Sequence, residues 1–256
     1  MPATIALGSQ KGGVAKTTTC LSLGACLAEM GRTALLIDLD PQAHLTMSLG
    51  FKPDMVRHTI EDVLLEGASP VSVSRESALA GLDIIPANSR LALTEKVLYR
   101  QKGYEFHLKN MLKTMEDFYD VVLIDCPPSF GALTINALTA ADLLIIPVPC
   151  EYYAAHSLRY ILELAGMVRE RTNPRLVYRL LVTMYDRRNR ISQVILAQMQ
   201  QGLKNVLLNT IIEVDTKLKE SPVFGQPITL YAPDTRGAQQ YRALVQELMN
   251  GHQKPQ

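Results

Sequence analysis

Tryptophan is absent from this chain, and only 6% of its 256 residues are aromatic. Long hydrophobic segments are absent as well: every uninterrupted apolar run is shorter than ten residues, whereas a membrane-spanning helix needs about 20. The first residues lead directly into an apolar run with the pattern of a strand, so no signal peptide is expected. These absences argue against membrane binding and predict a cytoplasmic protein.

Cysteine is scarce and scattered. The four cysteines are Cys20, Cys26, Cys126 and Cys150, and no two of them form a Cys-x-x-Cys pair. Cys20 and Cys26 are six residues apart on a predicted helix, so they point to different sides of it. The spacing favours buried free thiols in a reducing compartment over a metal cluster or a zinc site.

Net charge is close to zero, at +1, and does not by itself indicate a nucleic-acid-binding protein. The charges are unevenly distributed, however. Residues 159–242 contain 13 Lys and Arg against 7 Asp and Glu, whereas the rest of the chain contains 13 against 18. This asymmetry predicts a basic face on the C-terminal half.

Strand and helix patterns alternate along the whole chain, and no Pro/Gly/Ser-rich linker divides it. Short apolar runs predict strands at 4–7, 33–38, 82–86, 120–125, 143–148, 176–183 and 206–212. Helical periodicity predicts helices at 16–30, 60–65, 132–140, 153–171, 191–203 and 235–249, and an interrupted helical region at 90–115. We therefore expect one α/β domain over residues 1–256: a doubly wound, mostly parallel sheet flanked by helices, with a flexible polar tail at 250–256.

Residues 9–19 read Ser-Gln-Lys-Gly-Gly-Val-Ala-Lys-Thr-Thr-Thr and join a predicted strand to a predicted helix. Two glycines allow the backbone to turn its N–H groups inward, and a helix N-terminus adds positive potential. Lys16 can then reach the terminal phosphates of a nucleotide, and the Thr17 hydroxyl can bind Mg²⁺. A glycine turn without a ligand would need neither two lysines nor three threonines. The stretch predicts a phosphate-binding loop.

This loop departs from the common pattern Gly-x4-Gly-Lys-[Ser/Thr], whose outer glycines would fall at Gln10 and Ala15. The variant Lys-Gly-Gly-x-x-Lys-[Ser/Thr] fits instead, from Lys11 to Thr17. Alanine at position 15 removes the freedom of glycine to adopt a positive φ angle. We expect nucleotide binding to survive this change.

Acidic residues follow two of the predicted strands. Asp125 ends one strand and is the expected acid near a metal ion, acting directly or through metal-bound water. Asp38 and Asp40 follow another strand and either orient the attacking water or shape a turn. Because ligands of such sheets bind beyond the carboxyl ends of the strands, one crevice is expected to be formed by three loops, at 9–17, 38–46 and 125–131.

Three ordered motifs carry a resemblance to a known family. They are Lys-Gly-Gly-Val-Ala-Lys-Thr-Thr at 11–18, Asp-Leu-Asp-Pro-Gln at 38–42 and Asp-Cys-Pro-Pro-Ser at 125–129. Together they resemble the ParA/Soj partitioning ATPases, which belong with MinD to the deviant Walker A group of P-loop NTPases. The similarity extends over nearly the whole chain, with further matches at 181–186, 219–222 and 225–228.

The resemblance implies an ATPase that uses ATP and Mg²⁺ and forms a homodimer in the ATP state. It implies that Lys11 reaches the partner's nucleotide, that Gly12 lets the two loops approach, and that Asp40 supports hydrolysis. The candidate catalytic residues are Lys11, Lys16 and Asp40, and the candidate metal-binding residues are Thr17, Asp40 and Asp125. The candidate cofactor-binding residues are Lys11, Gly12, Gly13, Val14, Ala15, Lys16, Thr17, Thr18, Asp125, Met184, Glu213 and Asp215.

The resemblance also implies that the ATP dimer binds double-stranded DNA without sequence preference and associates with the nucleoid. A ParB-like partner would stimulate hydrolysis, and the cycle would position a plasmid, a chromosome origin or another cargo. The candidate DNA-binding residues are Arg187, Arg188, Arg190, Lys217 and Lys219, although a short run of charge is also typical of a solvated loop.

Two positions near the expected nucleotide base depart from the family. The Pro-Arg-Asn stretch that the family carries near the adenine is Glu-Val-Asp at 213–215, which leaves the base contacts open. A family arginine slightly further on is Lys217, which keeps the charge but loses the bidentate geometry of a guanidinium group.

Other ATPases of the same group remain as alternatives. A MinD-like spatial regulator would need a C-terminal amphipathic membrane anchor, but the apolar stripe within 238–249 is more typical of a helix packed on the domain. A nitrogenase-type iron protein would need cysteines that bridge a dimer, and Cys126 is poorly placed for that role. A regulatory module without hydrolysis would not need the two lysines and Asp40.

Overall fold

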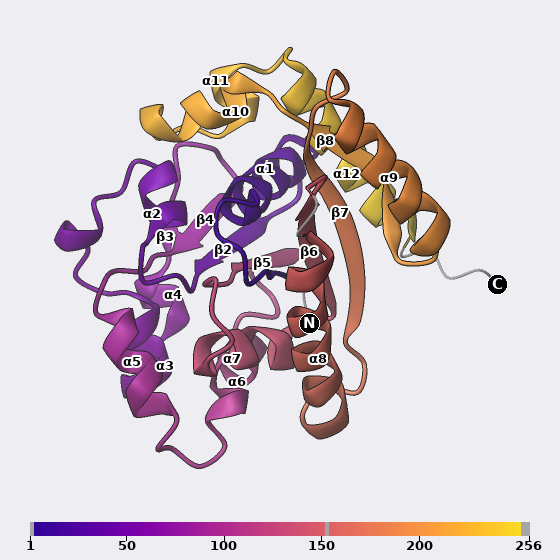
Figure 1. The fold of residues 1–256 in the computed structure, drawn as a ribbon. Coiled ribbons are helices and arrows are strands. Elements are labelled where there is room, and N and C mark those ends of the chain that lie inside the picture. The colour runs from indigo at the N-terminus through magenta and orange to yellow at the C-terminus, as the bar shows by residue number, and fades with distance from the viewer. Residues whose placement is uncertain (1–2, 152–153, 252–256) are drawn as a thin grey trace.

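The structure is a computed structural model of the chain and describes residues 3–151 and 154–251. One eight-stranded sheet forms its centre, with the strand order β3-β4-β2-β5-β1-β6-β7-β8 (Figure 1). Neighbouring strands are parallel except for β3, which pairs antiparallel with β4 at one edge. The strands are β1 (Ala3–Leu7), β2 (Ala34–Asp38), β3 (Arg75–Glu76), β4 (Leu82–Ile85), β5 (Val121–Asp125), β6 (Leu143–Pro149), β7 (Val177–Tyr185) and β8 (Leu207–Glu213).

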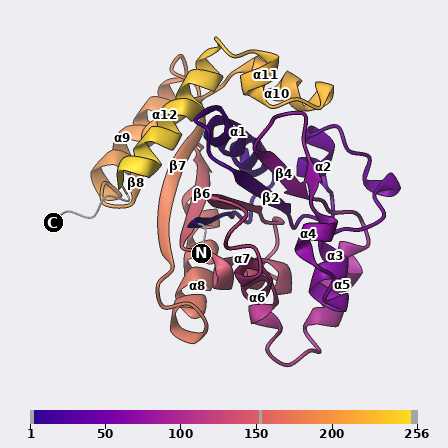
Figure 2. The same cartoon turned by 180° about the vertical axis from the view of Figure 1, so that it is seen from behind.

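Helices cover both faces of the sheet, as expected for a doubly wound fold (Figures 1 and 2). The α-helices are α1 (Lys16–Glu29), α2 (His44–Ser48), α3 (Ile60–Glu66), α4 (Pro70–Val73), α5 (Leu91–Leu98), α6 (His107–Lys113), α7 (Ala132–Ala140), α8 (Ala154–Arg171), α9 (Arg190–Gly202), α10 (Thr216–Glu220), α11 (Ile228–Tyr231) and α12 (Arg236–Gly251). Three short 3₁₀ helices are η1 (Pro53–Met55), η2 (Tyr104–Phe106) and η3 (Ser221–Phe224).

Two hydrophobic clusters, one on each face, hold the layers together. Along β2, Leu35 and Ile37 join the cluster under α3 and α5 to α8, whereas Leu36 joins the cluster under α1, α11 and α12. Successive strand side chains point to opposite faces, so a strand covered on both sides must be apolar throughout. This is why the central strands appear in the sequence as continuous apolar runs.

The seven strands expected from the sequence are all present, and their limits differ from the predicted ones by only a few residues. The two-residue strand β3 was not predicted, because it is too short to carry a pattern. The interrupted helical region at 90–115 divides into α5, η2 and α6. The predicted helix start at residue 153 lies outside the described residues, which resume at α8.

The C-terminal helix α12 packs against α1 and β8. Tyr241, Leu244 and Val245 are almost fully buried, and the Tyr241 hydroxyl lies 3.0 Å from Thr19 Oγ1. The apolar stripe is therefore packed on the domain, as the sequence indicates. Helix α12 continues to Gly251, so the first two residues of the expected tail are helical, and residues 252–256 lie outside the described part. No helix among the described residues has the length and hydropathy to cross a membrane.

Strand register places the ends of the central strands level with one another. Asp125 at the end of β5 pairs with Leu7 of β1 on one side and with Asp38 of β2 on the other. The loops that follow these three strands therefore meet at the carboxyl edge of the sheet. This arrangement agrees with the crevice expected from the sequence.

Gly24 lets α1 lie close to the sheet. An ideal Cβ at Gly24 would be 2.8 Å from Leu36 Cδ2 and 2.8 Å from Leu82 Cδ1, and both leucines are fully buried. We expect Gly24→Ala to lower the free energy of unfolding by about 1–2 kcal/mol, because overpacking outweighs the helix propensity that alanine gains. Urea unfolding measures the change.

The matched control is Gly166→Ala on α8, where no heavy atom outside the helix backbone lies within 4 Å of an ideal Cβ. This variant should be stabilised by about 0.5–1 kcal/mol. Stabilisation of the Gly24→Ala protein as well would contradict the close packing of α1.

Candidate nucleotide-binding site

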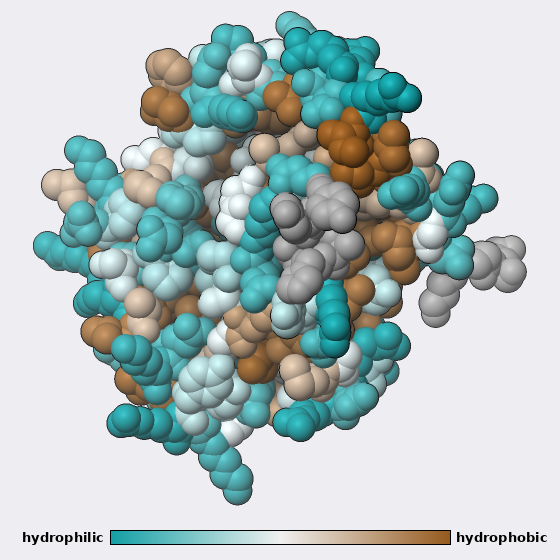
Figure 3. Space-filling view, viewed as in Figure 1, coloured by the Kyte–Doolittle hydropathy of each residue, from teal (hydrophilic) through white to brown (hydrophobic). Residues whose placement is uncertain are grey.

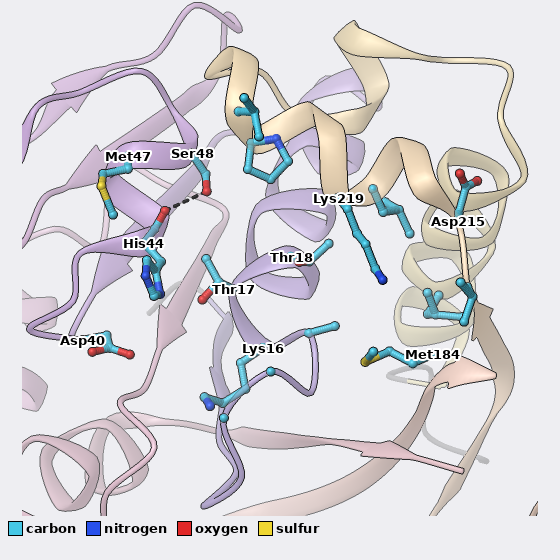
Figure 4. A pocket seen from close by; sticks show the side chains of 18 of the residues that line it. Lys16, Thr17, Thr18, Asp40, His44, Met47, Ser48, Met184, Asp215 and Lys219 are labelled. Atoms are coloured by element: carbon cyan, nitrogen blue, oxygen red, sulfur yellow. Dashed lines mark hydrogen bonds between the residues drawn. The ribbon is translucent and has the colours of Figure 1, made fainter. Parts of the chain in front are cut away.

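A cavity of about 580 Å³ lies beyond the carboxyl ends of the central strands. Four segments form most of its wall: the loop between β1 and α1, the loop and helix α2 that follow β2, the end of β8, and residues 218–223 (Figure 4). The predicted site residues that line it are Gly12, Gly13, Ala15, Lys16, Thr17, Thr18, Asp40, Met184, Glu213, Asp215 and Lys219. The volume is in the range of small-molecule sites.

Lys16 and Thr17 open helix α1 at the base of this cavity (Figure 4). Lys16 is only 7% exposed, and its ammonium group donates a 3.3 Å hydrogen bond to the Lys11 carbonyl, so it folds back over the loop. The Thr17 hydroxyl donates to Asp125 Oδ2 at 2.6 Å. The N-terminal N–H groups of α1 and one buried cation thus face the same space, which suits a phosphate group.

Asp125 lies directly behind Thr17 and is fully buried. Its Oδ2 atom accepts from Thr17, but its Oδ1 atom has no hydrogen-bond partner. Burial, and then the nearby Asp38 carboxylate, raises the pKa of Asp125 to about 8. A buried carboxylate oxygen without a partner is costly, and a cation or its bound water would supply the missing contact.

The residues around Asp125 fit Mg²⁺ that arrives with a nucleotide. The Thr17 hydroxyl and the Asp40 carboxylate are hard oxygen ligands that belong to residues lining the same cavity, and the Thr17 hydroxyl donates to Asp125. The described residues contain no cluster of three or more His, Cys, Asp or Glu side chains that could hold a metal ion alone. Phosphate oxygens would have to complete the coordination, as Mg²⁺ sites commonly require.

Asp38 holds the loop that carries Asp40. Its Oδ2 atom accepts from the Thr46 backbone N–H at 2.9 Å and from the Thr46 hydroxyl at 2.7 Å, and its Oδ1 atom accepts from the Asp40 N–H at 3.0 Å. Burial raises the pKa of Asp38 to about 6. Asp38 is fully buried and does not line the cavity, so its contacts are those of a loop anchor.

The contacts of Asp40 show the turn-forming role that the sequence left open, and its position in the cavity leaves the role in hydrolysis a prediction. Its Oδ1 atom accepts from the Gln42 N–H at 2.9 Å, which shapes the turn before α2. The residue also lines the cavity and lies opposite Thr17 and Lys16 (Figure 4). A carboxylate in this position can orient a water molecule beside a terminal phosphate.

Backbone strain is concentrated around the cavity. Among residues 3–151 and 154–251, three non-glycine residues have positive φ angles: Ala15 at 69°, Ala43 at 53° and Met184 at 54°. We expected that alanine at position 15 could not adopt the positive φ angle that glycine adopts freely, and this expectation is wrong. Ala15 adopts the left-handed conformation at the N-cap of α1, at a cost of about 1 kcal/mol or more.

Two parts of the site were only partly anticipated from the sequence: the expected crevice loop 38–46 includes His44 but not the rest of α2, and Lys219 was predicted to bind DNA rather than to line the cavity. Helix α2 contributes His44, Met47 and Ser48, and its five residues are too few to show a helical period. Residues 218–223 cover the opposite side of the cavity. Lys219 belongs to this segment and extends into the cavity, whereas Arg187, Arg188 and Arg190 do not line it (Figure 4).

The predicted basic cluster is partly neutralised by the protein itself. Arg187 pairs with Glu213 at 3.1 Å, and Arg188 pairs with Asp186 at 3.1 Å. Lys217 pairs with Glu220 at 2.7 Å and lies 5.7 Å from the centre of the Tyr231 ring. A uniformly basic face, as the charge count suggests, is therefore not what these residues form.

Arg190 differs from the other basic residues of the cluster. It is exposed at the start of α9 and forms no ion pair with another described residue. The exposed side chains of Ile191 and Val194 follow it on the same helix. Figure 3 shows apolar surface over this part of the molecule.

Three predicted cofactor-binding residues do not line the cavity as the described residues form it. Val14 is buried, and its carbonyl accepts from the Thr183 hydroxyl at 3.1 Å, which ties the loop to β7. Asp125 lies behind Thr17. Lys11 is directed to the other side of the loop, where its ammonium group forms an ion pair with Glu151.

Comparisons with known proteins agree with this geometry. A family model described as an AAA domain matches residues 2–178. The chain is 40% identical over 245 residues to the sporulation initiation inhibitor protein Soj of Bacillus subtilis, which covers 95% of this chain and 97% of that protein. It is 37% identical over 249 residues to the chromosome partitioning protein ParA of Caulobacter vibrioides, with coverage of 96% and 93%. The chain belongs to the ParA/Soj family of partitioning ATPases.

Solved structures place nucleotide and metal in relatives of this ParA/Soj ATPase. A Mycobacterium smegmatis protein named cobyrinic acid a,c-diamide synthase, with bound ATP analogue and magnesium, has a TM-score of 0.87 and 36% identity, and the match covers 100% of this chain and 99% of that one. A plasmid partition protein of Borrelia burgdorferi bound to AMPPNP has a TM-score of 0.81 and 25% identity, with coverage of 98% and 100%. ATP and Mg²⁺ are the cofactors of this ATPase family, and the protein is a P-loop ATPase.

The strained alanine of the phosphate loop gives a stability prediction. Ala15→Gly should raise the free energy of unfolding by about 0.5–1 kcal/mol, because glycine adopts the positive φ angle without a Cβ clash. Ala197→Gly, at an exposed position within α9, should instead lower it by about 1 kcal/mol. Denaturant unfolding of both variants tests the opposite signs. A loss of stability in Ala15→Gly would show that the methyl group is packed favourably.

The buried carboxyl group of Asp125 gives a pH prediction. Its folded-state pKa of about 8 lies above the ordinary value of 3.8, so folding favours the protonated form. Asp125 therefore contributes favourably to the free energy of unfolding below about pH 4, and this contribution is lost as the pH rises towards 8. In nucleotide-free protein without Mg²⁺, Asp125→Asn should raise the free energy of unfolding by about 2 kcal/mol at pH 8 and by less at pH 5.

Urea unfolding at several pH values, with and without Mg²⁺ and ADP, measures this effect. Mg²⁺ and ADP should stabilise the wild-type protein more than Asp125→Asn, because the charged carboxylate interacts favourably with the cation. Parallel pH profiles for the two proteins would contradict the unfavourable burial of this carboxylate.

Proposed function

We propose that this ATPase is a nucleotide-controlled switch that dimerises with ATP, binds double-stranded DNA without sequence preference, and positions or segregates a DNA or other cargo in association with the nucleoid. A ParB-like partner stimulates its hydrolysis. The observation that carries the proposal is that two lysines of the same loop lie on opposite sides of it. Lys16 lies in the cavity of its own protomer, whereas Lys11 does not line that cavity and lies on the outer side of the same loop.

The residues of one protomer bind and orient ATP. Lys16 and the N-terminus of α1 neutralise the β- and γ-phosphates, and the Thr17 hydroxyl turns its oxygen towards Mg²⁺ while donating to Asp125. Mg²⁺, when bound, spreads the negative charge that develops during phosphoryl transfer. Asp40 orients the attacking water from the opposite wall of the cavity.

The acidic residues at the end of the cavity that would hold the nucleotide base already contact other groups of the protein. The Asp215 carboxylate accepts from the backbone N–H groups of Lys217 and Gly237, both at 2.9 Å. Glu213 pairs with Arg187 and with Arg236, both at 3.1 Å. The Asp215 carboxylate therefore holds the backbone beside the base and the Glu213 carboxylate holds two arginine side chains, so contact with the base is made by Met184 and by main-chain groups.

A second protomer completes the site. Lys11 carries a charge that its own cavity does not use, and Gly12 has open space where a Cβ would stand. A second copy facing this loop brings the Lys11 ammonium group to the neighbouring γ-phosphate. Dimerisation then depends on ATP and brings two copies of each DNA-binding residue together.

Non-specific DNA binding requires basic groups that reach phosphates. Arg190 is the arginine of the predicted cluster that forms no ion pair within the part of the chain that the structure describes, and Arg187 and Arg188 must exchange their carboxylate partners for DNA phosphates. The DNA contact of one protomer is therefore weak, and the dimer strengthens it by presenting two copies.

Fluorescence anisotropy with labelled double-stranded DNA of arbitrary sequence tests the switch. We expect tight binding with ATP and weak binding with ADP or without nucleotide, and affinity should fall as salt rises. Lys16→Ala should remove both nucleotide binding and the effect of ATP on DNA binding. Equal DNA binding in all three nucleotide states would overturn the proposed switch.

The same assay locates the DNA contact. Arg190→Ala should weaken binding several-fold and reduce the salt dependence, because one phosphate contact is lost in each protomer. Arg159→Ala on α8 is the matched control, since Arg159 is exposed and pairs with Glu163 at 2.7 Å. Equal loss of affinity in both variants would place the DNA face elsewhere.

A further inference from the structure

Lys11 forms an ion pair with a residue 140 positions away in the sequence. Its partner, Glu151, lies two residues beyond the end of β6. Because β6 pairs in parallel with β1, the segments after both strands leave the sheet at the same edge. The Glu151 N–H donates to the Pro149 carbonyl at 2.8 Å, which forms a tight turn at the strand end.

The pair lies on the outside of the phosphate loop. Side-chain exposure is 36% for Lys11 and 52% for Glu151. Lys11 also lines a small recess with Val14 and the end of β6, on the far side of the loop from the nucleotide cavity. The Lys11 side chain is thus directed along its own protomer towards β6, within reach of solvent and of an approaching molecule.

We propose that Glu151 is a latch that holds Lys11 on its own protomer until a second ATP-loaded copy approaches. The inference rests on the ATP dimer proposed above. Lys11 must leave Glu151 to reach the partner's nucleotide, so the ion pair opposes dimerisation. The γ-phosphate of ATP offers a larger negative charge than one carboxylate and displaces it, whereas ADP lacks that phosphate.

The size of the effect follows from the exposure of the pair. An exposed ion pair stabilises its bound geometry by a factor of a few, and salt weakens it. Each dimer requires two Lys11–Glu151 ion pairs to break, one in each protomer, so the effects of the two pairs on the dissociation constant multiply. Removing Glu151 should therefore lower the dissociation constant of the ATP dimer about tenfold, and the difference should shrink in high salt.

Sedimentation velocity with a non-hydrolysable ATP analogue measures this constant for the wild-type protein and for Glu151→Gln. We expect tighter dimerisation of Glu151→Gln and an unchanged nucleotide affinity of the monomer, because the pair lies outside the cavity. Glu151→Asp should behave more like the wild type. In a Lys11→Ala background, Glu151→Gln should have no effect on dimerisation, since the latch has lost its partner.

Glu163→Gln is the matched control, because it also breaks an exposed ion pair of a glutamate, here with Arg159, but does not involve Lys11. Unchanged or weaker dimerisation of Glu151→Gln beside a normal wild-type dimer would overturn the latch alone. A wild-type protein that stays monomeric with the analogue would overturn the ATP dimer and the latch together.

Discussion

The parallel pairing of β5 with β1 on one side and β2 on the other is the constraint on which the site depends. It sets Asp125 beside Leu7 and Asp38, so the phosphate loop and the Asp40 loop begin at the same level of the sheet. The two buried carboxyl groups, Asp38 and Asp125, then share one apolar environment. Asp38 is satisfied by Thr46 and Asp40, whereas one oxygen of Asp125 is left without a partner.

In the nucleotide-free protein, this edge of the sheet carries two features that lower the stability of the fold. The carboxyl group of Asp125 is buried beside that of Asp38, which disfavours its charged form, and Ala15, Ala43 and Met184 hold left-handed backbone conformations around the cavity. Both features destabilise the folded state, and favourable interactions in the rest of the fold outweigh this cost. A cation and phosphates compensate the charge, so ligand binding and local stability are coupled at this edge of the sheet. The same loop carries Lys16 towards the cavity and Lys11 towards Glu151 on its outer side.

Sequence patterns predicted the sheet and the phosphate loop well because their signals are local. Strands buried on both faces must be apolar, and Gly12, Gly13, Lys16 and Thr17 sit at fixed spacing between a strand and a helix. The ion pairs that the charged side chains form could not be predicted from such local signals. Arg187 meets Glu213, and Lys11 meets Glu151, because distant strand ends converge. The positive φ angle of Ala15 escaped prediction since neighbouring structure overrides the residue's own preference.

The sequence by itself determined that this chain is a mostly parallel α/β protein with a phosphate-binding loop, because periodicity and motif spacing act over a few residues. Only the tertiary structure decided which way each charge points. Lys219 lines the cavity, Arg190 forms no ion pair with another described residue, and Lys11 is held at the end of β6. These outcomes depend on strand order and on which loops meet at the edge of the sheet, and no local pattern encodes that geometry.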